Sequence, residues 1–421
     1  MSAVRRLIAF NGKVESSIKF SPSSSELKTA CTDLINCFND LDNAERLRSL
    51  KSLGYFCLDY EILPEVRDRC QYCFSEVMHK DLLAIVIQDL RQMLLQVKNS
   101  QLSEQGRLKV QNKLVLNPKK GLAFAEDKIR SDWAENGGER AVSLFYAVLG
   151  ELRPKDVSSN LGWIVPGILN LMDDTSDLEG IKLQGVVLLN HFLKKSLDIQ
   201  SEQRFDFAST GLTTVFEPIL TSMWYHFPQS TEPGLTKKIW GTVFPALMSL
   251  YRAEYFSRPE LLRESVSRFL GETLLQVTVP RISADYMDLT IDTVNRVGSC
   301  LDVLGEKSVI HMQRILYVFG EYLICNVFIT DFRPLLPSVL AVLTGLVEKC
   351  ARDRVIAHKY NLLTCALVMC ERCYAEENSQ DPKVHQKCLP LIRILKDKGG
   401  EWTEDESRLV TSRLMSMDLE L

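Results

Sequence analysis

The sequence predicts an all-α protein, an α-solenoid of HEAT- or armadillo-like helical hairpins. Apolar residues recur at three- and four-residue steps in one segment after another, which is the period of an amphipathic helix. In the clearest segment, Leu161–Lys195, two apolar stripes of this kind flank a short acidic turn. A hairpin of two helices cannot bury both of its faces alone, so we expect it to stack on similar neighbours.

The first 97 residues are predicted to form helical hairpins of their own. The opening residues 1–20 are interpreted as a first helix with an ordinary charged face. In this segment the basic residues precede the first acidic residue, Glu15. Such a pattern also resembles a mitochondrial presequence, and the sequence leaves this alternative open. Further helices are expected at Glu26–Phe38, Ala44–Leu58, Pro64–Met78 and Leu82–Val97.

A polar segment, residues 98–140, separates these hairpins from the main solenoid, residues 141–421. It carries Gly and Pro breakers and weak periodicity, so we expect a connection with short helices. The β-branched run Val327–Thr330 is too short to predict a strand. Besides the pair in Leu161–Lys195, helices are predicted at Leu144–Leu152, Thr214–Phe227, Lys237–Tyr255, Pro259–Leu275, Asp285–Leu304, Ser308–Ile324, Pro334–Cys350, Ala357–Tyr374, Lys387–Leu395 and Ser407–Met417.

Length and composition restrict the class of protein. The chain has 421 residues, of which 46% are hydrophobic and 25% charged, as in an ordinary globular protein. Its net charge of −4 argues against a general nucleic-acid binder, which carries a basic excess. No apolar run reaches the ~18 residues of a transmembrane helix. The twelve cysteines are scattered over apolar helical segments, so we expect an intracellular protein without a disulfide framework.

The acidic turn of the clearest hairpin, Asp173-Asp174-Thr175-Ser176-Asp177, matches the spacing DDxxD. In all-α prenyl-diphosphate enzymes such carboxylates hold Mg²⁺ against substrate phosphates, since this ion prefers oxygen ligands. The second metal-binding motif of those enzymes is missing, and these carboxylates fall at a turn rather than within a helix. We therefore favour a structural role, in which Asp174 or Asp177 caps the second helix. Lys182 is expected to pair with Asp174 or its neighbour.

Two CxxC pairs, Cys70/Cys73 and Cys370/Cys373, could supply four thiolates to zinc. Residues three apart on a helix also share one face, and neither pair has the knuckle glycine of a zinc ribbon. We interpret them as two buried helix pairs. The six histidines show no metal spacing, and His191 is expected on a helix ridge rather than as a ligand.

Motifs for nucleotide phosphates, dinucleotides or a nucleophilic serine are absent from the sequence. These readings therefore lack support, and we predict no catalytic residue, no cofactor and no metal site. The partner-binding residues are unknown at this stage, and we expect them in the C-terminal half, where helical patterning is densest. One aromatic-rich region is predicted to be mostly core, with any exposed ring a candidate interface anchor: Trp224, Tyr225, Phe227, Trp240, Phe244, Tyr251, Tyr255 and Phe256.

The segment from Ile164 to Phe256 resembles the Tel-two-interacting protein two family. Its features are the hairpin ILNLMDD with IKLQGVVLLNHFL, the Thr210-Gly211-Leu212 box with Val215, Phe216, Glu217 and Leu220, the run His226-Phe227-Pro228, and Phe244-Pro245-Ala246-Leu247 with Leu250. Met172 and Met248 stand where we would expect leucine, and Gly180 also departs from the pattern.

This resemblance implies a non-enzymatic scaffold subunit of the Triple-T (TTT) cochaperone complex, cytoplasmic and nuclear. The implied partners are the large solenoid subunit and the Tel-two subunit of that complex, together with the ninety-kilodalton heat-shock chaperone machinery. The implied clients are PI-3-kinase-related kinases of TOR signalling, the DNA-damage response and telomere maintenance. Two alternatives remain open: an α-solenoid adaptor of another class, such as a transport or armadillo-type scaffold, and, more distantly, a Mg-dependent all-α prenyl-diphosphate enzyme.

Overall fold

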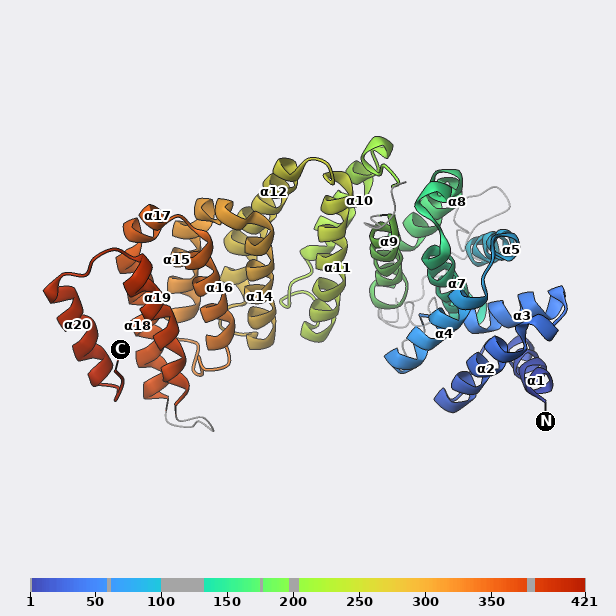
Figure 1. The fold of residues 1–421 in the computed structure, drawn as a ribbon, viewed down its shortest axis with the longest axis horizontal. Coiled ribbons are helices and arrows are strands. Elements are labelled where there is room, and N and C mark those ends of the chain that lie inside the picture. The colour runs from blue at the N-terminus through green and yellow to red at the C-terminus, as the bar shows by residue number, and fades with distance from the viewer. Residues whose placement is uncertain are drawn as a thin grey trace, which may run out of the picture. The chain divides into compact units, whose positions relative to one another are not determined.

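The computed structural model describes residues 2–58, 62–99, 132–174, 177–196, 204–376 and 383–420. These residues form helices and turns, with no strand among them, which confirms the predicted all-α fold (Figure 1). None of the helices described has the length and apolar character needed to cross a membrane. The chain divides into two compact units, Met1–His226 with Lys238–Glu254, and Phe227–Lys237 with Tyr255–Leu421.

The first unit contains successive helical hairpins. Its helices are α1 (Ala3–Ser16), α2 (Ser24–Cys37), α3 (Asn43–Gly54), α4 (Pro64–Val77), α5 (Lys80–Asn99), α7 (Gly138–Glu151), α8 (Pro154–Met172), α9 (Leu183–Ser196), α10 (Thr213–Trp224) and most of α11 (Pro233–Glu254). Short 3₁₀ turns, η1 (Phe38–Asp40) and η3 (Ala208–Thr210), and the π-helical turn η2 (Leu178–Lys182) lie between them.

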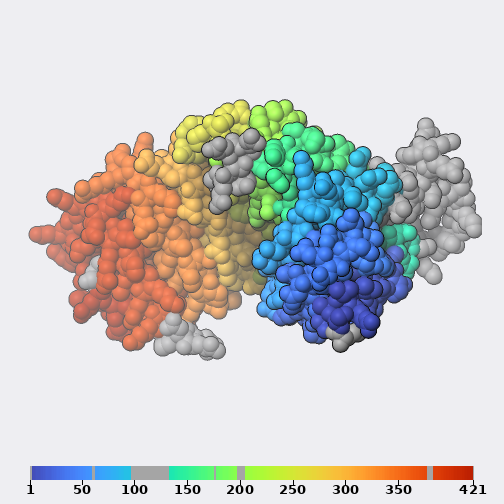
Figure 2. Space-filling view, turned by 45° about the vertical axis from the view of Figure 1, so that its right-hand side comes forward, coloured from blue at the N-terminus to red at the C-terminus, as the bar shows by residue number. Residues whose placement is uncertain are grey.

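Local chemistry explains where the N-terminal helices begin. Ser23 and Glu26 form a capping box at α2, in which each side chain accepts a hydrogen bond from the other residue's backbone N–H, at 3.0 and 3.2 Å. Pro64 occupies the first turn of α4, as predicted. Helix α1 buries Leu7, Phe10 and Val14 against its neighbours. Figure 2 shows the blue surface of α1 to α4 as one continuous block.

Helix α7 begins at Gly138, inside the range that the sequence predicts as connection. The buried indole of Trp133 lies so close to Gly138 that a Cβ built there would fall within 2.5 Å of it. Gly137 has a φ of +81°, a conformation that glycine adopts at little cost. Because of Gly137, Gly138 and Trp133, α7 begins before Leu144, the start that the apolar period predicts. Residues 100–131 of the predicted connection lie outside the described residues, so its limits stay a prediction.

The predicted hairpin of Leu161–Lys195 is present as α8 and α9. The predicted positions of the second stripe are buried, among them Leu188 and Leu189, whereas the first stripe buries Ile164, Ile168 and Met172 and leaves its other three positions half-exposed. The two helices approach closely at Gly185, where a built Cβ would lie 2.7 Å from Cγ and 2.9 Å from the backbone nitrogen of Met172. The glycine in the second stripe thus allows the two helices to cross in close contact.

Helices α10 and α11 pack through a stacked tryptophan pair and hydrogen bonds between the helices. The rings of Trp224 and Trp240 stack at 4.9 Å with an interplanar angle of 8°, and both are fully buried. The indole N–H of Trp240 donates to the backbone carbonyl of Trp224 at 2.8 Å. Further along, the hydroxyl of Tyr251 donates to Glu217 at 2.8 Å. The sequence prediction extended α10 to Phe227, but it ends at Trp224 because a turn follows.

The second unit is a two-layered solenoid. Its long helices are α12 (Pro259–Arg268), continued by η4 (Phe269–Thr278) and α13 (Val279–Ile282), then α14 (Met287–Leu304), α15 (Met312–Phe319) continued by η6 (Gly320–Ile324), α16 (Leu336–Lys349), α18 (Lys359–Ala375), α19 (Leu389–Lys398) and α20 (Glu404–Met415). Shorter pieces are η5 (Gly305–His311), α17 (Arg352–Ala357) and η7 (Val384–Cys388).

Each hairpin of this unit contributes one helix to each layer. The first layer contains the continuous helix from α12 to α13, then α15 with η6, α18 and α20, and successive members are neighbours. The second layer contains α14, α16 and α19, also as successive neighbours (Figure 1). This arrangement confirms the predicted stacking of hairpins. The run Val327–Thr330 lies in the turn between η6 and α16 and is not a strand.

Candidate interaction surface

The acidic turn between α8 and α9 has the geometry of a helix cap. The side chain of Asp177 accepts a hydrogen bond from the N–H of Gly180, and its own N–H donates to the side chain of Asp174, both at 2.8 Å. Asp177 is buried and stands at the start of η2. The predicted capping role of Asp177 agrees with this geometry. Thr175 and Ser176 of the turn lie outside the described residues. Asp173 ends α8 as its C-cap residue.

The expected ion pair of Lys182 is not found. Among the described residues Lys182 has no carboxylate within ion-pair distance, since Asp174 and Asp177 point to backbone amides of the turn. The charge of Lys182 instead acts on His226, where it adds to burial in lowering the pKa of that imidazole. Within the described part of the chain, no three His, Cys, Asp or Glu side chains gather as metal ligands.

Both CxxC pairs are buried on single helix faces. Cys70 and Cys73 lie on α4, where the Sγ of Cys70 is 3.8 Å from that of Cys31 on α2. Cys370 and Cys373 lie on α18, and burial raises the pKa of Cys373 to about 12. A thiol of such high pKa stays protonated and packs as a small apolar group. This agrees with the interpretation as buried helix pairs.

His191 is a half-enclosed ring on α9 that favours the neutral form. It stacks on Tyr146 with ring centroids 3.9 Å apart, and its Nε2 has no hydrogen-bond partner. Burial, followed by the charges of Lys195 and Lys194, lowers its pKa to about 4. Protonating this ring in the folded chain places a positive charge in a largely buried position beside two lysines.

Stability is therefore expected to fall as the pH drops through the window between 6.5 and 4. The unfolded chain, with a histidine pKa near 6.5, binds more protons there than the folded chain, so the proton stabilises the unfolded state. Between pH 7.5 and 5, His191 alone should cost about 2 kcal/mol. Urea unfolding at several pH values measures this. His191→Phe keeps the stack on Tyr146 and should flatten the profile; an identical slope in both proteins would contradict the assignment.

The residues of the family-like box are structural. The hydroxyl of Thr210 donates to the carbonyl of Phe207 at 2.7 Å and accepts from the N–H of Leu212 at 3.2 Å. Gly211 adopts a φ of +67° in the same turn. In the helices that follow, Phe216 is fully buried, Val215 is exposed, and Pro245 lies within α11. These six residues form the corner before α10 and the hairpin behind it, and they do not converge on a cavity.

Half of the rings of the aromatic-rich region are core residues, fewer than predicted, and Phe244 and Tyr255 are half-buried. Trp224, Phe227, Trp240 and Tyr251 are buried. Tyr225 in the first unit and Phe256 in the second remain exposed.

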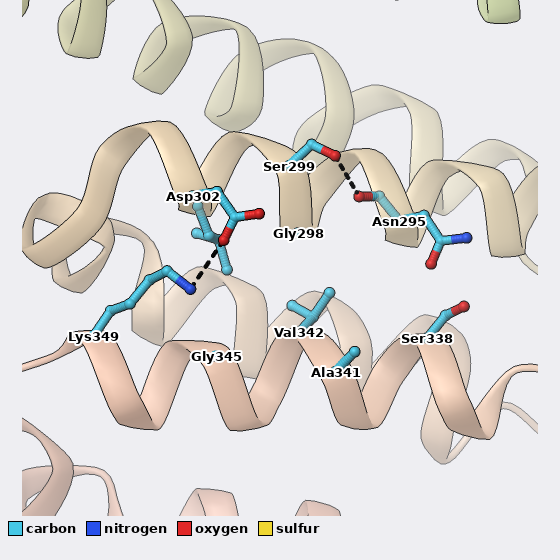
Figure 3. Close-up of a pocket in the computed structure, with 10 residues that line it drawn as sticks. Asn295, Gly298, Ser299, Asp302, Ser338, Ala341, Val342, Gly345 and Lys349 are labelled. Atoms are coloured by element: carbon cyan, nitrogen blue, oxygen red, sulfur yellow. Dashed lines mark hydrogen bonds and ion pairs between the residues drawn. The ribbon is translucent and has the colours of Figure 1, made fainter.

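A shallow groove between α14 and α16 marks the second layer of the C-terminal unit (Figure 3). It encloses about 190 Å³ between small residues such as Gly298, Ala341 and Gly345. At one end Asp302 and Lys349 point toward one another and pair at 3.0 Å. The two charged residues that line this groove pair with each other, so it offers a partner no charge without a counterion.

The first layer of the same unit carries a larger groove, between η4–α13 and α15. We call it the α15 groove; it encloses about 470 Å³ and is lined among others by Leu275, Pro280, Ile310, Arg314, Tyr317 and Tyr322. Ile310 is 68% and Tyr317 62% exposed. The opposite face of α15 is core, with Met312, Ile315 and Phe319 buried. The uncovered face of α15 carries Tyr317 beside the polar Gln313 and Arg314, and Ile310 precedes it on η5.

Next to this groove, the turn after η6 exposes the largest fraction of any large apolar side chains described. Val327 is 83% and Phe328 79% exposed. The turn is firmly held: Asn326 accepts from the N–H of Phe328 at 2.9 Å and donates to the carbonyl of Tyr322 at 3.0 Å. The guanidinium of Arg372 donates to the carbonyls of Ile324, at 2.9 Å, and Ile329. A rigid turn that displays two apolar side chains loses little entropy on binding a partner.

Sequence reasoning did not identify Ile310, Tyr317 or Phe328, although it expected the surface in the C-terminal half. The available signal was weak: Ile310 and Tyr317 lie off the buried stripe of α15, but Gln313 and Arg314 between them are polar. The pattern alone does not tell which apolar side chains a neighbouring helix covers.

Comparison with known proteins gives two matches and one negative result. The model of the Tti2 family matches residues 59–331, which include the whole α15 groove and the turn of Val327 and Phe328. The curated protein "TEL2-interacting protein 2" of Saccharomyces cerevisiae (strain ATCC 204508 / S288c) is 32% identical over 386 residues, covering 89% of this chain and 90% of the yeast protein. No solved structure matches the chain. Because the family model covers more than half of the chain and the yeast relative nearly all of it, the chain belongs to the Tti2 family.

Proposed function

We propose that this chain is a non-enzymatic scaffold subunit of the Triple-T cochaperone complex. Its membership in the Tti2 family carries the proposal, since the yeast relative is named for an interaction with TEL2. The proposed partners are the Tel-two subunit and the large solenoid subunit. With the heat-shock chaperone machinery, the assembled complex would promote the folding and stability of PI-3-kinase-related kinases in TOR and DNA-damage signalling.

The fold supports a binding role through its large exposed helical surface. A two-layered solenoid offers extended contact area on its helix faces. Exposed Ile310, Tyr317, Val327 and Phe328 supply the apolar and aromatic side chains that anchor protein–protein interfaces. The grooves on this surface are shallow, and the acidic turn is occupied with capping its helix. These observations favour a scaffold over the prenyl-diphosphate alternative.

Affinity purification of the full-length chain from its host tests the proposed assembly. We expect the Tel-two subunit and the large solenoid subunit to be recovered in stoichiometric amounts, with an unrelated α-solenoid of the same host as the control bait. Recovery of transport cargo in place of these subunits would favour the alternative of a transport adaptor.

Depletion of the chain tests the proposed role in kinase maturation. Steady-state levels of TOR-type and DNA-damage kinases should fall while their transcripts stay constant, and re-expression of the chain should restore them. Unchanged kinase levels would contradict the proposal. We also propose that the chain resides in cytoplasm and nucleus. Cell fractionation checks this, and recovery in mitochondria would support the presequence alternative instead.

A further inference from the structure

The α15 groove has the composition of an interface anchor site. Ile310 on η5 and Tyr317 on α15 both line it, together with Arg314 and the polar Gln276 and Gln313. Tyrosine and arginine are the residues most enriched at interface positions that dominate binding energy. At 62–68% exposure, the two apolar side chains leave a large area in contact with water that a partner would cover.

The walls of this groove are rigid. Helix α15 packs Met312, Ile315, Leu316 and Phe319 into the core. Just before α15, the ring of His311 is fixed by a 2.7 Å hydrogen bond between its Nε2 and the hydroxyl of Ser267 on the neighbouring α12. A groove that is formed before binding requires little ordering when a partner enters.

The charge of the groove indicates which residues the partner segment should carry. Arg314 is the single charged residue that lines the groove, and among the described residues no carboxylate lies within ion-pair distance of it. An arginine flanked by apolar side chains gains most from a carboxylate that arrives together with apolar groups, since both are then shielded from water. The partner segment should thus present Asp or Glu between apolar residues.

The helical walls of the groove indicate the conformation of the partner segment. Both walls are helices, and the described residues contain no sheet edge to which an extended strand could add. An extended segment would have to find partners for its backbone N–H and C=O groups among a few polar side chains, Gln276, Gln313 and Arg314. A helix satisfies these groups internally.

We propose that an amphipathic α-helix of a partner subunit of the complex docks in the α15 groove. Its apolar side chains contact Ile310 and Tyr317, and a carboxylate between them pairs with Arg314. This inference rests on the proposed function and locates its binding surface in the C-terminal unit.

Binding of the purified full-length chain to its purified partner subunits tests the proposal. Tyr317→Ala and Arg314→Glu should each weaken binding by at least about 30-fold, the loss typical of a dominant anchor residue. Two controls change equally exposed residues elsewhere, Tyr72→Ala on α4 and Arg408→Glu on α20, and should bind as the wild type does. All four sites are exposed, so the circular dichroism and the thermal midpoint should stay unchanged, which separates lost contacts from lost folding.

Photo-crosslinking identifies the occupant. With benzoylphenylalanine at position 317, the crosslinked peptide should come from an amphipathic helix of a partner subunit that contains Asp or Glu. Exchanging that carboxylate for arginine should restore binding to the Arg314→Glu variant. Crosslinks to a second copy of this chain would overturn the inference.

The two proposals fail in different ways. If the wild-type chain binds none of the partner subunits, the proposed function fails, and this inference with it. If the wild type binds and both groove variants bind equally well, only the inference fails, and the surface lies elsewhere.

Discussion

Replacing Trp240 with alanine is expected to destabilise the first unit by about 4–5 kcal/mol. Truncating a fully buried aromatic residue typically costs about 3–5 kcal/mol, and the stacked partner ring adds about 1 kcal/mol. The backbone carbonyl of Trp224 also loses its indole donor. Because protein domains are stable by only about 5–15 kcal/mol, most of the margin of this unit would be lost.

Urea unfolding followed by tryptophan fluorescence measures this effect, with Trp240→Phe as the matched control. Phenylalanine keeps an aromatic ring against Trp224 but lacks the N–H donor, so it should cost about 1–3 kcal/mol. The order wild type, Trp240→Phe, Trp240→Ala is the expected result. A Trp240→Ala variant with an unchanged urea midpoint would show that the tryptophan pair is not part of the core.

Replacing Leu188 with proline should disrupt α9, at a cost of about 3 kcal/mol or more from the backbone alone. Position 188 lies within α9, where proline removes a hydrogen bond and its ring collides with the preceding turn. The fully buried leucine side chain is lost as well. Since α9 packs against both α7 and α8, the damage should spread through this part of the first unit.

The variant Leu188→Ala isolates the backbone contribution. Alanine removes most of the side chain but keeps the N–H, so it should cost about 2–5 kcal/mol by lost packing only. Leu188→Pro should be less stable than Leu188→Ala and less abundant in the soluble fraction at raised temperature. Equal midpoints for wild type and Leu188→Pro would mean that this segment is not helical in solution.

Trp240→Ala and Leu188→Pro are expected to destabilise the fold, whereas Tyr317→Ala and Arg314→Glu should leave it intact. Comparing the two kinds of variant separates loss of folded protein from loss of one contact. Loss of Trp240 or Leu188 should reduce the amount of folded chain, and with it every interaction that the chain makes. Loss of Tyr317 or Arg314 should remove one interaction at constant abundance. A cellular defect in kinase levels can therefore be assigned either to instability of the scaffold or to a missing contact.

The positions of the helices follow from the sequence because they depend on local spacing. The stripes of α8 and α9 and the capping aspartate between them could be read from residues less than ten positions apart. Errors occurred where a contact distant in sequence or an unusual backbone conformation decides the boundary. Helix α7 starts early because of Trp133 and Gly137, and α10 stops early at a turn.

Side-chain partners were harder to predict than helices. Lys182 has acidic neighbours in the sequence, yet the turn directs Asp177 to a backbone amide, which satisfies the carboxylate without a cation. Likewise, Cys70 and Cys373 were recognised as buried because their helix faces are apolar. The contact of Cys70 with Cys31 depends on how α2 and α4 pack and has no signal in the spacing of either helix.

The sequence by itself determined that this protein is a stack of helical hairpins, because apolar period, caps and breakers act within a few residues. It also carried the resemblance to the family. Only the tertiary structure decided which apolar residues face water. Ile315 and Tyr317 lie two positions apart on α15, and the first is buried while the second is exposed. The reason is physical: a side chain is covered only where another helix packs over it, and the neighbouring helices leave open the face of α15 that carries Tyr317.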